Sequence, residues 1–287
     1  MSHTIQVGNL RIGRGGPLAL IAGPCVIESR ELCLRVAEHC RALADELGLP
    51  LIFKSSYTKD NRSTITSYQG PGLEAGLRVL EEVRAAFDVP VLSDVHTPEE
   101  CAPAAEVLDV LQIPAYLSMQ SQLVIAAARA GKAVNVKKGQ FLHPLDMRNV
   151  VGKIEACGNT NILLTERGTC LGYHNLVADM RSLPMMRSLG YPVVFDPTHT
   201  VRKYGVSSAD PAGGDPQYIP HLTRAGVAAG VDVLFIETHP DPPGALCDAA
   251  SMLPMSRLRA LMEDCVRLHE IARAADERPF ESCGDAS

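Results

Sequence analysis

The sequence predicts an α/β protein, a (β/α)8 TIM barrel with a short N-terminal β-hairpin. Three observations favour this fold: eight short apolar runs, longer amphipathic segments between them, and a length of 287 residues, which is ordinary for one such barrel. The runs hardly alternate with polar residues, as expected of strands covered on both faces. A doubly wound open sheet is the alternative. It usually has fewer repeats and a Gly-rich phosphate turn, and neither a GxGxxG nor a Walker sequence occurs here.

The expected elements follow one another at regular intervals. The apolar runs are Leu18–Cys25, Pro50–Ser56, Pro90–His96, Val110–Ala115, Ala133–Lys138, Asn161–Arg167, Pro192–His199 and Val233–His239. The helical patterns are Ser29–Gly48, Gly72–Phe87, Thr97–Leu108, Ser121–Gly131, Pro144–Cys157, Leu176–Leu189, Pro216–Gly230 and Leu253–Ala275. Ahead of them, Thr4–Ile12 has Gly8-Asn9 at its centre, which indicates a hairpin at the barrel floor.

The remaining segments fit a single domain over residues 1–287. The longest stretch without a clear pattern is Thr200–Asp215, directly after the seventh run. A loop of this length in a compact domain is commonly an active-site lid. Asp276–Ser287 is expected to be a flexible tail.

Composition and charge exclude several classes of protein. The net charge of −6 argues against a nucleic-acid-binding surface. The sequence contains neither an uncharged apolar run of about 18 residues nor a secretory signal, so we expect no membrane contact and a cytoplasmic location. The nine cysteines are scattered without a CxxC pair, which predicts reduced thiols.

Polar residues recur where the expected strands end, and active sites of this fold lie at the carboxyl ends of the strands. Polar groups in apolar strands are costly to bury without partners or a ligand, so their recurrence predicts a site. The residues concerned are Cys25, Lys54, Asp94, Gln112, Lys137, Arg167, His199 and Glu237, with Lys59, Asn61 and Arg62 just beyond the second strand.

Six cations gather at this rim although the protein is acidic. They are Lys54, Lys59, Arg62, Lys137, Lys138 and Arg167. Such a group favours anionic ligands such as phosphate or carboxylate, and could serve two phosphorylated substrates. The alternative is an internal ion-pair network with Asp94, Glu166 and Asp196. Lys138 is expected to pack outside the site, because adjacent strand residues point to opposite faces.

A second group could surround one divalent ion. It consists of Cys25, His199, Glu237 and Asp248, and its mixed sulfur, nitrogen and oxygen donors suit Zn²⁺, Fe²⁺ or Mn²⁺. The first and eighth strands are neighbours in a closed barrel, so these side chains can converge. His96, His143 and His239 could compete for the histidine position.

Six motifs in order resemble the 3-deoxy-D-manno-octulosonate 8-phosphate synthases, which condense phosphoenolpyruvate with arabinose 5-phosphate. They are AGPCVIES at 22–29, FKSSYTKDNRS at 53–63, NVKKGQF at 135–141, LTERG at 164–168, FDPTH at 195–199 and FIETHPD at 235–241. The similarity runs from about residue 5 to 275. The related synthases that use erythrose 4-phosphate have Lys-Pro-Arg-Thr-Ser where this chain has Lys59-Asp-Asn-Arg-Ser63.

The resemblance implies a role for each candidate residue. Cys25 matches the metal-dependent branch, since the metal-independent branch has asparagine there. Lys137 and Arg167 would hold the phosphate of phosphoenolpyruvate, with Lys54 and Gln112 nearby. The sugar would contact Lys59, Asn61 and Asp94, and its phosphate Arg62 and Ser63. The family also implies a homotetramer.

Two departures from the family concern the acceptor end. Met119-Gln-Ser-Gln122 stands where relatives have Arg-Gln-Thr-Asp, whose arginine reaches the sugar phosphate of a neighbouring subunit. Gly213-Gly214 precedes Asp215, where relatives have a basic residue. Both changes remove positive charge, so a relative that uses another aldehyde is an alternative.

The sequence thus predicts a metal-dependent transferase that forms a C–C bond. Lys59 is the candidate acid for the aldehyde oxygen, and Lys137, Asp94 and His199 complete the catalytic set. The sequence also leaves open a Schiff-base aldolase with Lys137 as nucleophile and a binder without activity, with Cys25 as a redox-sensitive thiol.

Overall fold

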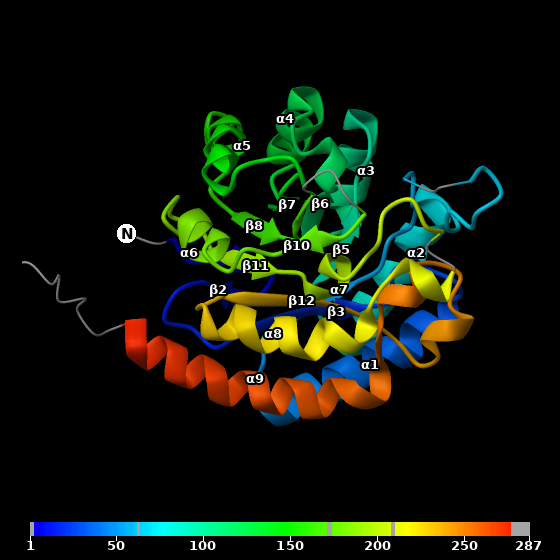
Figure 1. The fold of residues 1–287 in the computed structure, drawn as a ribbon. Helices are drawn as coiled ribbons and strands as arrows, with labels where there is room; N and C mark the ends of the chain where they lie inside the picture. The colour runs from blue at the N-terminus through cyan, green and yellow to red at the C-terminus, as the bar shows by residue number, and fades with distance from the viewer. Residues whose placement is uncertain (1–2, 62–63, 171–173, 208–209, 277–287) are drawn as a thin grey trace, which may run out of the picture.

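A closed parallel barrel forms the centre of the computed structural model, which describes residues 3–61, 64–170, 174–207 and 210–276. Its eight strands follow the order of the sequence, and β12 pairs with both β11 and β3 to close the sheet (Figure 1). The strands are β3 (Ala19–Gly23), β4 (Leu51–Lys54), β5 (Val91–Asp94), β6 (Val110–Ile113), β7 (Ala133–Lys137), β8 (Ile162–Glu166), β11 (Val193–Phe195) and β12 (Val233–His239). The predicted barrel is confirmed, and the open doubly wound sheet is wrong.

Helices cover the outside of the barrel, with α3, α4 and α5 along one side and α8, α9 and α1 along another (Figure 1). They are α1 (Arg30–Leu47), α2 (Leu73–Phe87), α3 (Pro98–Val107), α4 (Ser121–Arg129), α5 (Met147–Glu155), α6 (Ser182–Arg187), α7 (Pro197–Thr200), α8 (Ile219–Ala228) and α9 (Met255–Asp276). Helix α1 shows the local rules: the Ser29 hydroxyl accepts the Leu32 N–H at 3.1 Å, and Gly48 ends the helix at φ 67°. Within the described ranges, no helix is long and apolar enough to cross a membrane.

Several short elements complete the chain. The strands are β1 (Ile5–Val7), β2 (Leu10–Ile12), β9 (Thr169–Cys170), β10 (Leu176–Val177) and β13 (Leu253–Pro254), and the 3-10 turns are Ala115–Leu117, Pro144–Asp146, Pro211–Gly213, Pro216–Tyr218, Pro242–Gly244 and Ala249–Ser251. The first two strands form the predicted hairpin, with Ile5 opposite Ile12.

Strand alternation divides the apolar residues into two layers. Inward residues near the amino ends of the strands, such as Ile52, Leu92 and Leu163, pack with Ile5 and Ile12 of the hairpin. The outward residues join the apolar faces of the helices in the larger core. Because the hairpin fills the amino end of the barrel, the site has to open at the carboxyl end.

Three sequence expectations need correction. Leu176–Leu189 is not one helix, because its start pairs as β10 with β9 and only Ser182–Arg187 is helical. Pro192–His199 is not strand throughout: the Asp196 side chain caps the first turn of α7 and Pro197 takes its first position. Strand β12 has the predicted bounds and α9 ends one residue later than predicted, at Asp276, whereas the other predicted strands and helices are each shorter by one or a few residues at their ends. Residues 277–287 of the expected tail lie outside the described ranges.

Candidate active site

A ladder of polar side chains lies above the apolar layer, on the inward positions of neighbouring strands. Thr165 donates to Asn135 Oδ1 at 2.6 Å, Asn135 donates to Gln112 Oε1 at 2.8 Å, and Gln112 donates to Asp94 Oδ1 at 2.5 Å. All four residues are buried. Since each amide has both a donor and an acceptor in use, the ladder fixes the Asp94 carboxylate at the floor of the site.

Two lysines and two carboxylates form the next layer. Lys54 Nζ donates to Glu237 Oε1 at 2.5 Å and to the Cys25 carbonyl oxygen at 2.7 Å. Lys59 Nζ lies 3.3 Å from Asp94 Oδ2 and 3.9 Å from Glu237 Oε1. The ion-pair network that the sequence offered as an alternative to ligand binding is therefore present, but Lys59 also faces a cavity.

Close packing of β3 on β4 brings Cys25 to this layer. A Cβ atom at Gly23, whose φ is 156°, would lie 1.9 Å from the Lys54 carbonyl oxygen. Only glycine lets the backbones approach so closely, and Cys25 follows two residues later.

Asp196 links the cationic and the metal-ligating groups. Its carboxylate Oδ2 lies 2.5 Å from Lys137 Nζ and 2.7 Å from His199 Nδ1. Lys137 Nζ also lies 3.5 Å from the centre of the Phe235 ring. The carboxylate thus orients the imidazole so that Nε2 points away from it, an arrangement common behind metal-ligating histidines. The sequence analysis placed Asp196 only in the alternative ion-pair network, and its contact with His199 was not predicted.

Burial and charge pairing set the protonation of this layer. Burial lowers the pKa of His199, against the effect of Asp196, which favours the neutral imidazole. Burial also disfavours the charge of Lys59, but Cys25 and Asp94 raise its pKa well above the ordinary value. For Lys137 burial prevails over Asp196 and lowers the pKa.

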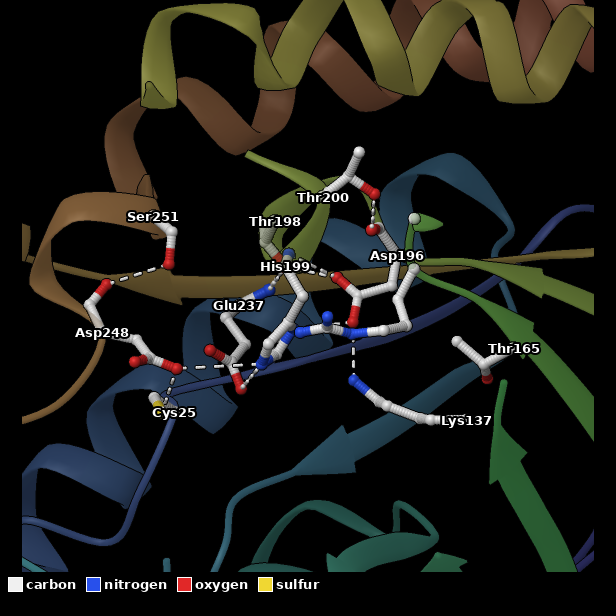
Figure 2. Close-up of polar contacts among 12 residues, drawn as sticks. Cys25, Lys137, Thr165, Asp196, Thr198, His199, Thr200, Glu237, Asp248 and Ser251 are labelled. Carbon is white, nitrogen blue, oxygen red and sulfur yellow. Dashed lines mark hydrogen bonds and ion pairs between the residues drawn. The ribbon is translucent and has the colours of Figure 1, made fainter. Parts of the chain in front are cut away.

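The candidate metal ligands meet around Asp248, as Figure 2 shows. Asp248 Oδ2 lies 3.4 Å from Cys25 Sγ and 3.7 Å from His199 Nε2, and His199 Nε2 lies 3.8 Å from Glu237 Oε1. Asp248 adopts a left-handed conformation with φ 49°, which turns its side chain to the site. The ligand atoms of His199, Glu237 and Asp248 lie close enough to hold a cation, and those of Cys25, Cys247 and Asp248 form a second such group, so the two groups share Asp248. Their sulfur, nitrogen and oxygen donors are of the kinds that bind borderline divalent metals.

The surroundings of the Cys25 thiol favour its proton unless a cation is bound. Its pKa is raised well above the ordinary value by burial, by the hydrogen bond with Cys247 and by the charge of Asp248. Cys247 Sγ lies 2.8 Å from Cys25 Sγ and is a further candidate ligand, which sequence reasoning missed because the two cysteines are far apart in the chain. Among the described residues, His96, His143 and His239 belong to neither group of candidate ligands.

A cavity of about 260 Å³ opens above these layers. Predicted site residues supply much of its wall, namely Lys59, Asn61, Asp94, Gln112, Lys137, Arg167 and His199. An adjoining cavity shares part of this wall and extends to Arg202, Tyr204 and Asp248. Lys59, Arg167 and His199 line both cavities, so cations and a candidate metal ligand share the wall between them.

The remaining candidates have different positions. Lys138 lies behind the cavity wall, 3.6 Å from Glu166 Oε1. Met119 is 39% exposed at the start of α4, and Asp215 pairs with Lys203 at 2.8 Å. Arg62 and Ser63 lie outside the described residues.

Comparisons with known proteins match nearly the whole chain. The sequence model of the DAHP synthetase I family covers residues 3–273. A relative from Trichlorobacter lovleyi is 54% identical over 273 residues, which are 95% of this chain and 100% of the relative. A relative from Geobacter metallireducens is 50% identical over the same shares. Both are named 2-dehydro-3-deoxyphosphooctonate aldolase. The resemblance inferred from the six motifs is confirmed, and the chain belongs to the DAHP synthetase I family.

Proposed function

We propose that this protein condenses phosphoenolpyruvate with D-arabinose 5-phosphate and water, giving 3-deoxy-D-manno-octulosonate 8-phosphate and inorganic phosphate. One observation carries the proposal: buried cations line two adjoining cavities at the carboxyl end of the barrel together with His199 and Asp248, two of the candidate metal ligands. The names of relatives that are about half identical over nearly the full chain support the same reaction.

The phosphoenolpyruvate subsite consists of Lys137 and Arg167, with Lys54 and Gln112 nearby. Arg167 is 5% exposed and offers a planar set of N–H donors that matches phosphate or carboxylate oxygens. Lys137 stands beside it on β7 and offsets the charge that develops on the phosphate-bearing fragment. Both side chains are buried, and the attraction between a buried cation and an anion is greater than in water.

The acceptor subsite consists of Lys59, Asn61 and Asp94, which line the same cavity. Arg62 and Ser63 lie outside the described residues, and their role at the sugar phosphate rests on the family resemblance. The raised pKa of Lys59 keeps it protonated near neutral pH, so its ammonium can donate to the aldehyde oxygen. Asp94 holds that ammonium at 3.3 Å, which makes it a positioning group.

Cys25, His199, Glu237 and Asp248 would hold one divalent ion, Zn²⁺, Fe²⁺ or Mn²⁺. When bound, such an ion supplies Lewis-acid chemistry that orients the aldehyde or activates water. Asp196 keeps His199 in the orientation that this role needs, because it contacts Nδ1 and leaves Nε2 for the ligand position.

The proposed reaction forms one C–C bond and breaks one C–O bond. C3 of phosphoenolpyruvate forms a bond to the aldehyde carbon, whose oxygen takes a proton from Lys59, while water adds at C2 and gives up a proton that replaces the one lost by Lys59. The resulting hemiketal phosphate then breaks the C2–O bond to its phosphate: the C2 hydroxyl becomes the ketone, and its proton leaves with the inorganic phosphate. Lys137 and Arg167 hold that phosphate throughout, so their contribution is electrostatic and positional.

The experiment is to measure phosphate release from phosphoenolpyruvate with arabinose 5-phosphate and, separately, erythrose 4-phosphate. We expect rapid release with the five-carbon sugar and an eight-carbon product by mass spectrometry. Release with neither sugar would contradict the proposed acceptor.

A second candidate is a synthase of the same kind with another aldehyde. Met119 and Asp215 favour it, since both stand where relatives have basic residues, and Asp215 is already paired with Lys203. Profiling of aldehydes distinguishes the two, because activity confined to arabinose 5-phosphate would rule it out.

A Schiff-base aldolase and a binder without activity each have a distinct test. A Schiff base at Lys137 would be trapped by borohydride, but the pairing of Lys137 with Asp196 at 2.5 Å favours an electrostatic role. Binding of phosphoenolpyruvate without phosphate release with any acceptor would indicate a binder.

We also propose that the protein is a homotetramer, which light scattering can check. The cytoplasmic location and the single domain stay predictions.

A further inference from the structure

Tyr204 lies against the proposed phosphate subsite although no sequence motif singled it out. Its hydroxyl oxygen accepts one N–H from Arg167 Nη1 and one from Gln140 Nε2, each at 2.5 Å. The guanidinium carbon lies 5.9 Å from the centre of the Tyr204 ring. Two separate donors therefore converge on one phenol oxygen at the edge of the cavity.

The segment that carries Tyr204 is held by contacts with three neighbouring loops. The Tyr204 N–H donates to the His174 carbonyl oxygen at 2.9 Å, and the Lys203 N–H donates to the Gly213 carbonyl oxygen at 2.9 Å. Arg202 Nη1 lies 3.4 Å from Asp248 Oδ1. The hydroxyl is thus held in place by backbone contacts and not by Arg167 alone.

Tyr204 occupies one N–H donor of the Arg167 guanidinium, and other donors remain for a ligand. Its Nε is buried and has no hydrogen-bond partner among the described residues. A buried guanidinium donor without a partner is costly, which indicates that an anion completes the site. Gln140 Oε1 is likewise buried without a partner in the described part of the chain.

The hydrogen-bond inventory of a phenol permits a second contact. A tyrosine hydroxyl accepts with two lone pairs and donates one proton. Since the Arg167 and Gln140 contacts both use the lone pairs, the proton is left to donate, and the side chain of Tyr116, a hydrogen-bond partner of Tyr204, lies beside it.

We propose that Tyr204 is a positioning residue for the phosphate subsite: its hydroxyl fixes the Arg167 guanidinium so that the remaining donors face a phosphate dianion. This inference rests on the proposed role of Arg167 in holding phosphoenolpyruvate. It adds a residue that belongs to neither the metal group nor the cations predicted from the sequence.

The first test compares the wild type with Tyr204→Phe, which removes only the hydroxyl. Calorimetric titration of the metal-loaded enzymes uses inorganic phosphate and phosphoenolpyruvate as separate probes. We expect both dissociation constants, and the KM for phosphoenolpyruvate, to rise about tenfold, the effect of one hydrogen bond to a charged group, with kcat changing less. Unchanged or tighter binding would overturn the proposal, since tighter binding means that the hydroxyl occupies the place of the phosphate.

Tyr218→Phe is the matched control, because Tyr218 is 54% exposed and does not line either cavity that Arg167 lines. Neither dissociation constant should change in it. If Tyr204→Phe does not fold, Gln140→Met removes the other contact of the same hydroxyl, and it should weaken phosphate binding in the same direction.

A double-mutant cycle tests whether Tyr204 acts through Arg167. In the Arg167→Lys background, Tyr204→Phe should weaken phosphate binding by less than about twofold, because the orientation of the guanidinium no longer matters. A repeated tenfold loss would show independent action and overturn the proposal. Loss of phosphate affinity in Tyr204→Phe without turnover in the wild type would contradict the proposed function alone. Turnover with unaltered affinity in the variant would contradict this inference alone.

Discussion

The two ends of the barrel are built from the same strands but have opposite chemistry. At the amino end, inward residues such as Ile52, Leu92 and Leu163 fill the interior against the hairpin. Two to four residues further along the same strands stand Lys54, Asp94 and, just past β8, Arg167. The difference explains how the fold can contain a buried charged layer. The favourable free energy of burying apolar surface at one end offsets the cost of desolvating charges at the other.

Removal of the metal should have the largest effect on activity, and it should act on the carboxyl end of the barrel alone. We expect chelation to slow phosphate release about 100-fold or more, because loss of a Lewis acid costs several kcal/mol of transition-state stabilisation. Added Zn²⁺, Fe²⁺ or Mn²⁺ should restore it. Full activity after chelation, with metal shown to be absent by mass spectrometry, would show that the reaction does not need a metal.

The variants Cys25→Ser and Cys247→Ser test which of two buried thiols binds the metal. The first should lose stoichiometric metal and the second should keep it, because Cys25 belongs to the proposed ligand set. Metal content by mass spectrometry is the measurement. The reverse result would make Cys247 the sulfur ligand.

Lys59→Met tests the proton donor. The variant should lower kcat by about 10²–10⁴, the usual contribution of a general acid. Lys203→Met is the control, since Lys203 is a cation near the same rim that pairs with Asp215 and lines neither cavity of the site. An equal loss in both variants would point to a general effect of positive charge.

For Asp94 we expect a smaller effect, on how the free energy of unfolding depends on pH. Burial alone would raise its pKa, but Lys59 and Lys54 hold that pKa well below the ordinary value. A carboxyl whose pKa is lowered by folding stabilises the folded state above about pH 4, and this contribution is lost as the pH falls through the folded pKa. Urea unfolding at several pH values should therefore show a flatter acid dependence for Asp94→Asn than for the wild type. The exposed Asp45→Asn should keep the wild-type slope, and equal slopes in all three would refute the low pKa.

Much of the fold could be predicted because buried parallel strands leave a continuous apolar signal. All eight were located, and polar residues at their ends marked the site, since a charge in an apolar run has few structural explanations. The helix over Leu176–Leu189 was wrong because strand pairing of Leu176 with Cys170 depends on a distant segment. The Asp196-Pro197 turn did have a local signature, an N-cap residue followed by proline, which the apolar run concealed.

Other parts of the site could not be predicted from one sequence. Cys247 meets Cys25 only when the barrel closes, and no spacing pattern links residues that far apart. Tyr204 lies in a segment without periodicity, so its contact with Arg167 follows from backbone contacts of the folded chain. The spacing of the four candidate ligands was only a weak signal, which the family resemblance strengthened, and the structure places them in two groups that share Asp248.

The most direct test of the division between the two ends compares Leu163→Ala with Arg167→Lys, two changes toward opposite ends of the same strand. Leu163 is fully buried in the apolar layer, so its truncation should lower the free energy of unfolding by about 2–5 kcal/mol and leave kcat/KM within about twofold. Arg167→Lys should lower kcat/KM at least about tenfold and change the free energy of unfolding little, because the charge is kept and the planar contact is lost. Loss of activity in Leu163→Ala as large as that in Arg167→Lys would contradict the division.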